Sequence, residues 1–355
     1  MQVRKLSWSH FRNLSGGELL PNEGMNVICG ENAQGKTNII EAIWLFSGAK
    51  SFRTLKDSAF IEKGFDFGKT ELTFLADGIE KQAKIEFREK RQAFLNEKPL
   101  SGPAKLAGIF NTVIFSPADL ALIQGAPEER RKFLDLAIGQ LYPAYIVLLH
   151  RYKKALLQRN KTLKDYKYDG SLTVMLDIFE EELAQVGAEI INRRIAFLQK
   201  MKDFLPNLYA QLSGGKEKLT FSYRESCSPE LLARRLAQGR QEDMLLGSTS
   251  VGPHRDDILF QINEFSVRNY GSQGQQRSVA LSLKLAQAEI IFQQTGEYPV
   301  CLLDDVMSEL DPTRQNFVLN HICRHQCFLT CCDPANINGL QNGKIFQMEK
   351  GTVTA

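Results

Sequence analysis

The strongest chemical pattern in the chain is a run of eight residues, Gly30-Glu31-Asn32-Ala33-Gln34-Gly35-Lys36-Thr37, which fills every fixed position of the G-x-x-x-x-G-K-[ST] phosphate-binding motif. Glycines in such a loop let the backbone wrap a polyphosphate, and the free N–H groups of a following helix attract the anion. We expect Lys36 to reach the β- and γ-phosphates of a nucleoside triphosphate and Thr37 to ligate Mg²⁺. A chance glycine-rich turn before a helix is the alternative.

The segments on either side of this loop favour the phosphate site. Met25–Cys29 is apolar and predicts a short strand, and the residues from Asn38 to Phe46 have the composition of a helix. Phe11-Arg12-Asn13-Leu14 lies between two strand-like segments upstream. Arg12 is either a solvated surface charge or a contact to the nucleotide.

A second group of polar residues follows a predicted strand near the C-terminal end. Val300-Cys301-Leu302-Leu303 is apolar and ends in Asp304 and Asp305. We expect Asp304 to bind Mg²⁺ together with Thr37, and Asp305 to orient or deprotonate an attacking water. Asp311 then precedes Pro312 at the end of an S-x-L-D turn. Lys36, Asp304 and Asp305 are therefore the candidate catalytic residues.

The segment before this strand predicts the start of a long helix. Tyr270-Gly271-Ser272-Gln273-Gly274-Gln275 is followed by an amphipathic pattern from Gln276 to Ala286. This order resembles the signature helix and carboxylate-tipped strand of ABC-type ATPases, in which the signature of one subunit completes the nucleotide site of another. Ser272, Gly274, Gln275 and Asp311 are therefore expected to bind ATP, within an ATP-dependent homodimer.

Leu212-Ser213-Gly214-Gly215-Lys216 comes close to the same signature, but it precedes an alternating segment from Lys218 to Tyr223. A genuine signature must open a helix, because it presents the helix N-terminus to a phosphate. We interpret residues 212–216 as a glycine turn before a strand.

Composition is that of an ordinary globular protein. The chain has 355 residues, of which 43% are hydrophobic and 24% charged, with a net charge of +3. Any nucleic-acid surface must therefore come from local patches. No apolar run is long enough to span a bilayer, the N-terminus does not resemble a signal peptide, and the seven cysteines lack metal-ligand spacing, so we expect a cytoplasmic protein. Cys331 and Cys332 are interpreted as small buried residues.

The pattern along the chain predicts an α/β fold with a discontinuous head. Period-2 segments between residues 51 and 115 indicate a partly antiparallel sheet beside the phosphate-loop strand. Helical spacing from Pro127 to about Leu163 and from about Leu172 to Leu205 predicts two antiparallel helices of roughly 40–50 Å each. We predict a head of residues 1–119 and 245–355, with a mixed sheet around the loop, and a mostly helical arm of residues 120–244 that carries partner and DNA contacts.

Basic residues gather toward the end of the first predicted helix: Arg151, Lys153, Lys154, Arg159, Lys161, Lys164 and Lys167. They are either a solvated helix face or a stripe that contacts nucleic-acid phosphates without reading sequence. Arg193-Arg194 and Arg234-Arg235 are weaker candidates for the same role.

Taken together, these motifs resemble the RecF family of bacterial recombination mediators, in the SMC-like branch of the ABC ATPases. The resemblance covers nearly the whole chain and is carried by Phe11-Arg12-Asn13, Gly30 to Ala42, Ser51-Phe52-Arg53-Thr54, Phe115 to Leu120, Arg130 to Asp135, Val251 to Asp257 and Tyr270 to Asp311. It adds Arg12 and Asn13 to the candidate nucleotide contacts.

The resemblance implies a weak, DNA-stimulated ATPase whose ATP-bound dimer clamps duplex DNA near single-strand gaps and junctions. It also implies RecO and RecR as partners that help to load RecA recombinase. The chain departs from ABC ATPases at three positions. Asp305 stands where glutamate is commoner, no clear Q-loop glutamine is found, and Cys331-Cys332 stands where a switch histidine is expected. An ABC transporter motor subunit, an SMC-like head outside recombination and a P-loop kinase are the alternative functions.

Overall fold

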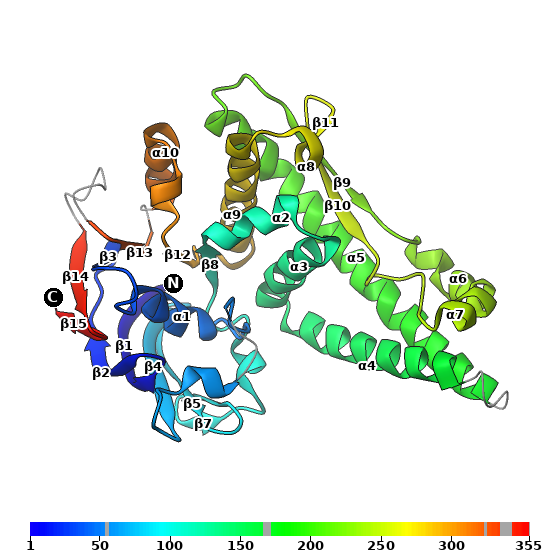
Figure 1. The fold of residues 1–355 in the computed structure, drawn as a ribbon, viewed down its shortest axis with the longest axis horizontal. Coiled ribbons are helices and arrows are strands. Elements are labelled where there is room, and N and C mark those ends of the chain that lie inside the picture. The colour runs from blue at the N-terminus through cyan, green and yellow to red at the C-terminus, as the bar shows by residue number, and fades with distance from the viewer. Residues whose placement is uncertain (54–56, 166–171, 323–324, 334–342, 355) are drawn as a thin grey trace. The chain divides into compact units, whose positions relative to one another are not determined.

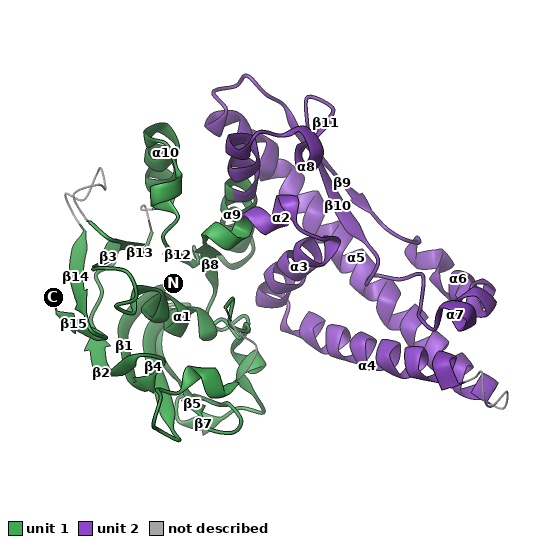
Figure 2. Ribbon diagram, in the orientation of Figure 1, with its two compact units in different colours: residues 1–119, 281–355 green, residues 120–280 purple. Residues whose placement is uncertain are grey.

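The computed structural model describes residues 1–53, 57–165, 172–322, 325–333 and 343–354. The chain folds into two compact units, unit 1 with residues 1–119 and 281–355 and unit 2 with residues 120–280 (Figure 2). The first boundary lies where the sequence placed it, and the second lies at 280/281 instead of 244/245. Residues 245–280 group with unit 2 because a strand within them pairs with a strand of that unit.

Unit 1 contains a six-stranded sheet with the order β15-β14-β3-β13-β12-β8, parallel from β14 to β8. Its strands β3, β8 and β12 are buried along their whole length, as expected for a parallel sheet covered on both faces. The predicted strands at 25–29 and 300–303 are confirmed. The bounds are β3 Met25–Cys29, β8 Thr112–Phe115, β12 Val300–Leu303, β13 Cys327–Cys331, β14 Lys344–Glu349 and β15 Thr352–Thr354.

A second, antiparallel sheet of unit 1 has the order β2-β1-β4-β5-β6-β7. The antiparallel pairing predicted within residues 51–115 is confirmed for β4, β5 and β6. These strands form a sheet separate from that of β3, which only β8 of this segment joins. Alternating burial along β4 gives this second sheet one core face. The bounds are β1 Gln2–Phe11, β2 Leu14–Leu19, β4 Gly68–Ala76, β5 Ile79–Phe87, β6 Gln92–Leu95 and β7 Lys98–Pro99.

Helix α1, Lys36–Leu45, packs against both sheets (Figure 1). Nearly all of its residues are buried, and its apolar side chains share one core with residues such as Phe11 and Phe74 of the antiparallel sheet and Ile28 and Phe328 of the parallel sheet. A helix whose apolar residues point in several directions is stable when it is covered on each of those sides. The loop that precedes α1 is therefore anchored by two sheets.

Unit 2 is mostly helical, and its longest helices, α4 and α5, run antiparallel side by side (Figure 1). Helix α5 has 40 residues and therefore a length of roughly 60 Å. The helical bounds are α2 Ala121–Gln124, α3 Pro127–Leu141, α4 Pro143–Asp165, α5 Thr173–Leu212, α6 Leu232–Gln238, α7 Arg240–Leu246 and α8 Val267–Tyr270. Helix α9, Gln273–Thr295, continues into unit 1, which also contains α10, Pro312–Ile322. Strands β9 Leu219–Arg224, β10 Asp257–Ile262 and β11 Phe265–Ser266 form a small antiparallel sheet.

The helical pattern predicted from Pro127 to Leu163 forms two helices, α3 and α4, because the helix breaks at Tyr142. This residue has φ −132° and ψ 84°, and Pro143 begins the next helix. Proline disfavours the helical conformation of the residue before it and lacks the N–H that a continuous helix would need. The glycine turn and strand predicted for residues 212–223 are confirmed, since α5 ends at Leu212 and β9 follows.

Two arginines of the predicted basic surface are buried instead. Arg159 is fully buried, and its guanidinium donates to Asp243 at 2.7 Å and to Glu180 at 2.9 Å. Arg194 is also buried and donates to Asp135 at 2.9 Å. Both therefore stabilise the packing of unit 2 and are not available to nucleic acid. Lys167 lies outside the described residues.

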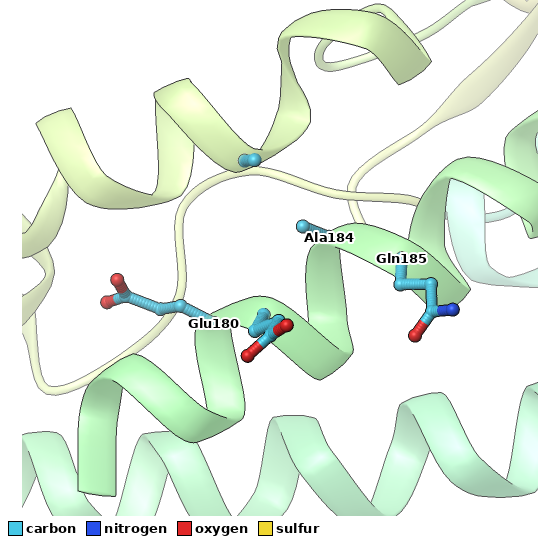
Figure 3. A pocket seen from close by; sticks show the side chains of 5 residues that line it. Glu180, Ala184 and Gln185 are labelled. Atoms are coloured by element: carbon cyan, nitrogen blue, oxygen red, sulfur yellow. The ribbon is translucent and has the colours of Figure 1, made fainter. Parts of the chain in front are cut away.

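A pocket of about 450 Å³ opens beside α5 and is lined by Glu180, Glu181, Ala184, Gln185 and Ala233 (Figure 3). Its Glu180 carboxylate is already engaged by Arg159 and Arg240. The pocket contains none of the residues predicted to bind a nucleotide. Within the described residues, no helix combines the length and the apolar character needed to cross a membrane.

Arg159→Ala is expected to destabilise unit 2 strongly, because it leaves the fully buried Asp243 without its arginine partner and leaves Glu180 with Arg240 alone of its two arginines. Removal of one member of a buried ion pair costs about 3–5 kcal/mol. The matched control is Arg151→Ala, whose exposed pair with Glu182 is worth about 0–1 kcal/mol. The free energies of unfolding of both variants, measured in denaturant, check the prediction. Equal losses in the two variants would contradict it.

Candidate functional site

The loop of residues 30–37 joins β3 to α1, as the motif requires. Three of its residues have positive φ angles, which are 152° at Gly30, 65° at Ala33 and 112° at Gly35. A Cβ added at Gly35 would lie 2.8 Å from Asn13 Oδ1 and 2.9 Å from Leu14 Cδ2. Gly35 is thus required both for its backbone conformation and for the close approach of the neighbouring chain.

Lys36 is folded back over this loop. The side chain is almost completely buried, and its ammonium donates to the carbonyls of Gly30 at 2.6 Å and Glu31 at 3.0 Å. The positive charge of Lys36 therefore lies beside the loop backbone, where an ammonium group that binds phosphate is needed.

Thr37 and Asp304 meet although they are far apart in sequence. Thr37 Oγ1 donates to Asp304 Oδ1 at 2.9 Å. The same carboxylate oxygen accepts from Thr330 Oγ1 at 3.0 Å, and Thr330 Oγ1 in turn accepts from the backbone N–H of Asp305 at 2.9 Å. The structure thus brings together three of the predicted residues around Thr330. Sequence reasoning did not select Thr330, and its position near the end of a strand beside β3 was the available signal.

The oxygen atoms of this cluster suit Mg²⁺, which prefers carboxylate and hydroxyl ligands. Burial raises the pKa of Asp304 above its ordinary value, and the nearby Asp305 charge adds to this, while the hydrogen bonds from Thr37 and Thr330 oppose it. A carboxylate whose charge is costly to bury gains from a bound cation. Thr37 and Asp304 therefore fit the predicted metal site.

Arg12 and Asn13 support the loop from the side. The Arg12 guanidinium makes a two-point ion pair with the fully buried Glu41 of α1, at 2.9 and 2.8 Å, and also donates to the Ala59 carbonyl. Asn13 donates to the carbonyl of Ala33 at 3.2 Å. The described hydrogen bonds of Arg12 are therefore made within the protein, and direct contact of either residue with a nucleotide stays a prediction. Glu41 was not selected from the sequence, although it lies one helical turn after Thr37.

Ser272 and Gln275 form a reciprocal cap at the start of α9, in unit 2. The Ser272 backbone N–H donates to Gln275 Oε1 at 2.7 Å, and the Gln275 N–H donates to Ser272 Oγ at 3.2 Å. Ser272 is exposed, and Gly274 lies within the first turn of the helix. Gln275 also donates to Glu217 at 2.8 Å. The predicted signature therefore does open a helix, unlike residues 212–216.

Two further positions complete the predicted set. Asp311 caps α10, because its Oδ1 accepts the N–H of Arg314 at 3.1 Å. The interpretation of Cys331 and Cys332 as buried was wrong, since Cys331 is half-buried and Cys332 is exposed. The parallel sheet ends at Cys331, so Cys332 lies beyond the strands that would cover it.

Known proteins match this chain along nearly its whole length. The family model described as RecF/RecN/SMC N terminal domain matches residues 2–354. A protein of Agathobacter rectalis named DNA replication and repair protein RecF is 37% identical over 359 residues, and one of Listeria innocua with the same name is 39% identical over 367. Each match covers 99% of both chains. The chain belongs to the RecF family. Membership places it among the proteins of DNA replication and repair.

Solved structures agree with this assignment. Two structures of the recombination mediator protein RecF in the RecFOR pathway, described as RecF-ATPrS and RecF-ATP, have TM-scores of 0.92 and 0.91 at 36% identity. Both cover 99% of this chain and 97% of theirs. An Smc head domain derived from Pyrococcus furiosus, at 17% identity and a TM-score of 0.58, shares the fold alone. The predicted fold class, an SMC-like ABC ATPase head with an inserted helical arm, is confirmed.

Gly35→Ala is expected to lower stability more than Gly64→Ala. Both glycines have positive φ, 112° and 97°, so an alanine at either position is strained by about 1–3 kcal/mol. At Gly64 a Cβ meets no atom within 4 Å, whereas at Gly35 it clashes with Asn13 and Leu14. The additional overpacking costs about 1–3 kcal/mol. Thermal unfolding of the two variants measures the difference in stability. Equal melting temperatures would contradict the claim that Asn13 and Leu14 leave no room for a side chain at position 35.

Proposed function

We propose that the chain is an ATP-dependent DNA-binding protein of recombinational repair and that two copies close on ATP to grip duplex DNA. The Thr37–Asp304 hydrogen bond carries the proposal, because it unites the phosphate loop with the carboxylate-tipped strand in one site. Slow hydrolysis then releases the dimer. The proposed setting is the cytoplasm, at single-strand gaps and junctions, with RecO and RecR as partners in loading RecA.

The first unit supplies most of the groups for binding and hydrolysis. The backbone N–H groups of residues 30–35 and the start of α1 bind the phosphates, and Lys36 donates to the β- and γ-phosphates. Thr37 and Asp304 would hold Mg²⁺, which neutralises charge on the phosphates when bound. Asp305 orients the attacking water. Its backbone N–H is held by Thr330, so the carboxylate is attached to a fixed point.

Asp305 also supports the expectation of slow turnover. Phosphoryl transfer depends on the positioning of groups that are already in place, and an aspartate is one methylene shorter than the glutamate common at this position. We assign Arg12 a positioning role through Glu41, and Asn13 a role in holding Ala33 of the loop. Direct contacts of Arg12, Asn13 and Asp311 with ATP remain part of the proposal.

The second copy is proposed to supply the N-terminus of α9. Ser272 is exposed at a capped helix start, and its hydroxyl still has a proton to donate, so an exposed helix N-terminus of this kind suits a γ-phosphate. Gly274 and Gln275 hold this turn in place. If two copies that enclose ATP bind it more tightly than one copy does, then ATP binding and dimerisation are linked equilibria. Loss of the γ-phosphate weakens both.

Asp305→Asn is expected to become a stable dimer with ATP and to stay a monomer without it, because the variant retains the phosphate and magnesium ligands but not the group that orients water. Light scattering after size exclusion measures the mass in both states. Ser272→Arg, made in the same background, is expected to bind ATP as a monomer.

Two outcomes would contradict the proposal that ATP is enclosed between two copies of the chain. One is an Asp305→Asn mass that does not change with ATP. The other is a loss of ATP binding by the Ser272→Arg monomer, which would mean that Ser272 serves its own subunit. Gln92→Arg, which places an arginine at an exposed position of β6 in unit 1, is the matched surface control.

The exposed lysines of α4 are the proposed DNA contacts within unit 2. With Arg159 buried and Arg151 paired to Glu182, the remaining candidates on this helix are Lys153, Lys154, Lys161 and Lys164, all of which are exposed. Lysines on a helix bind phosphates as point charges and carry no sequence preference. The expected grip is therefore salt-dependent and independent of sequence.

A Lys154→Glu/Lys161→Glu variant is expected to weaken ATP-dependent binding to duplex DNA. These residues are seven apart and share one helix face, and each lost phosphate contact reduces the slope of log affinity against log salt by about one. Fluorescence anisotropy across a salt series measures the slope, with Lys105→Glu, on the exposed surface of unit 1, as the control. An unchanged slope in the variant would mean that these lysines of α4 do not contact DNA. A wild-type affinity that does not depend on salt would contradict binding through the DNA phosphates.

A further inference from the structure

Cys332 lies against the phosphate-binding loop. It is the first residue after β13, and its side chain is exposed. Its Sγ accepts a hydrogen bond from Lys36 Nζ at 3.6 Å and donates to Asn32 Oδ1 at 3.3 Å. Both partners belong to the loop that is proposed to hold the phosphates. The thiol therefore contacts the group on which triphosphate binding depends.

Two neighbouring cysteines, Cys29 and Cys331, differ from Cys332 in their burial. Cys29 and Cys331 lie opposite each other on the adjacent parallel strands β3 and β13. Burial raises the pKa of Cys331 to about 12, with a contribution from Cys29, and burial also raises the pKa of Cys29. Because the thiolate is the nucleophile, these two sulfurs are poor reaction partners at neutral pH.

Exposure further separates Cys332 from the other cysteines that the structure describes. Cys227, Cys301 and Cys327 are buried. A reagent dissolved in water thus reaches Cys332 first. The position is also one at which the sequence lacks the histidine expected in ABC-type ATPases, so an exposed thiol lies beside the loop at this place.

We propose that Cys332 is a reversible thiol-modification site that controls access of ATP to the phosphate loop, with a small disulfide such as glutathione disulfide as the reagent. This inference rests on the proposed function of the loop. In the reaction, the Cys332 thiol loses its proton to solvent and its sulfur attacks one sulfur of the reagent. A new S–S bond forms, the S–S bond of the reagent breaks, and one glutathione leaves as a thiolate. Cys332 is oxidised, the leaving sulfur is reduced, and excess thiol reverses the exchange.

The adduct and ATP compete for the same space and charge. The added atoms are attached to a sulfur that lies 3.6 Å from Lys36 Nζ, and the carboxylates of the glutathionyl group compete for this ammonium and repel a triphosphate. Conversely, a bound triphosphate covers the sulfur. The covered sulfur reacts more slowly. Because binding couplings are reciprocal, ATP must also shift the exchange equilibrium toward the free thiol if the adduct weakens ATP binding.

The test uses the full chain carrying Cys323→Ser, so that every remaining cysteine is one that the structure describes. The protein is treated with glutathione disulfide, the adduct is located by peptide mass spectrometry, and ATP affinity is measured by calorimetry before treatment, after treatment and after reduction. We expect one adduct, at Cys332, and an affinity lower by about tenfold to hundredfold, the value of one charge-assisted hydrogen bond. Reduction restores the affinity, and ATP added beforehand slows the reaction.

Two matched variants distinguish an effect of modification at Cys332 from general oxidative damage to the protein. Cys332→Ser should show the same ATP affinity with and without the reagent, whereas Cys331→Ser should remain as sensitive as the parent protein. An adduct at Cys332 that leaves ATP affinity unchanged, an adduct at another cysteine, or a reaction rate that ATP does not alter would each overturn the inference. Absence of ATP binding before any treatment would overturn the proposed function itself, and so is distinguishable from failure of the thiol site.

Discussion

The hydrogen bond between Thr37 and Asp304 joins two segments that are 267 residues apart in sequence. One partner lies in the first turn of a helix that packs against two sheets, and the other directly follows β12, an interior strand of the parallel sheet. The bond can form only when the strands β3, β13 and β12 are in register, so that their carboxyl ends meet at one edge. The whole of unit 1 is thus the scaffold for one short contact between a hydroxyl and a carboxylate.

Burial sets the chemistry of that edge. It raises the pKa of Asp304, and the same low exposure keeps Lys36 close to its loop carbonyls. Thr330 links the two aspartates by accepting from one backbone N–H and donating to the other carboxylate. A site built from groups that are already oriented needs little reorganisation when a charged ligand arrives, which is the main physical route to catalysis of phosphoryl transfer.

Unit 2 depends on a different principle, because its long helices are joined by buried ion pairs as well as by apolar contacts. Arg159 and Arg194 each connect segments that are distant in sequence, and each is surrounded by carboxylates. Such pairs add little net stability but penalise any packing in which a charge loses its partner. They therefore favour one arrangement of α3, α4 and α5, from whose unit the capped start of α9 projects Ser272 into solvent.

The sequence by itself determined the phosphate loop, the strands at 25–29 and 300–303, the helix start at Ser272 and the family, because each depends on local spacing of glycines, apolar residues and caps. Only the tertiary structure decided which charges are surface charges: Arg159 and Arg194 have the same local pattern as exposed lysines, and their burial comes from partners far along the chain. Thr330 and Glu41 were not predicted as part of the site, and Cys332 was predicted to be buried, for the same reason. No local pattern marks a residue whose importance lies in what the fold places beside it.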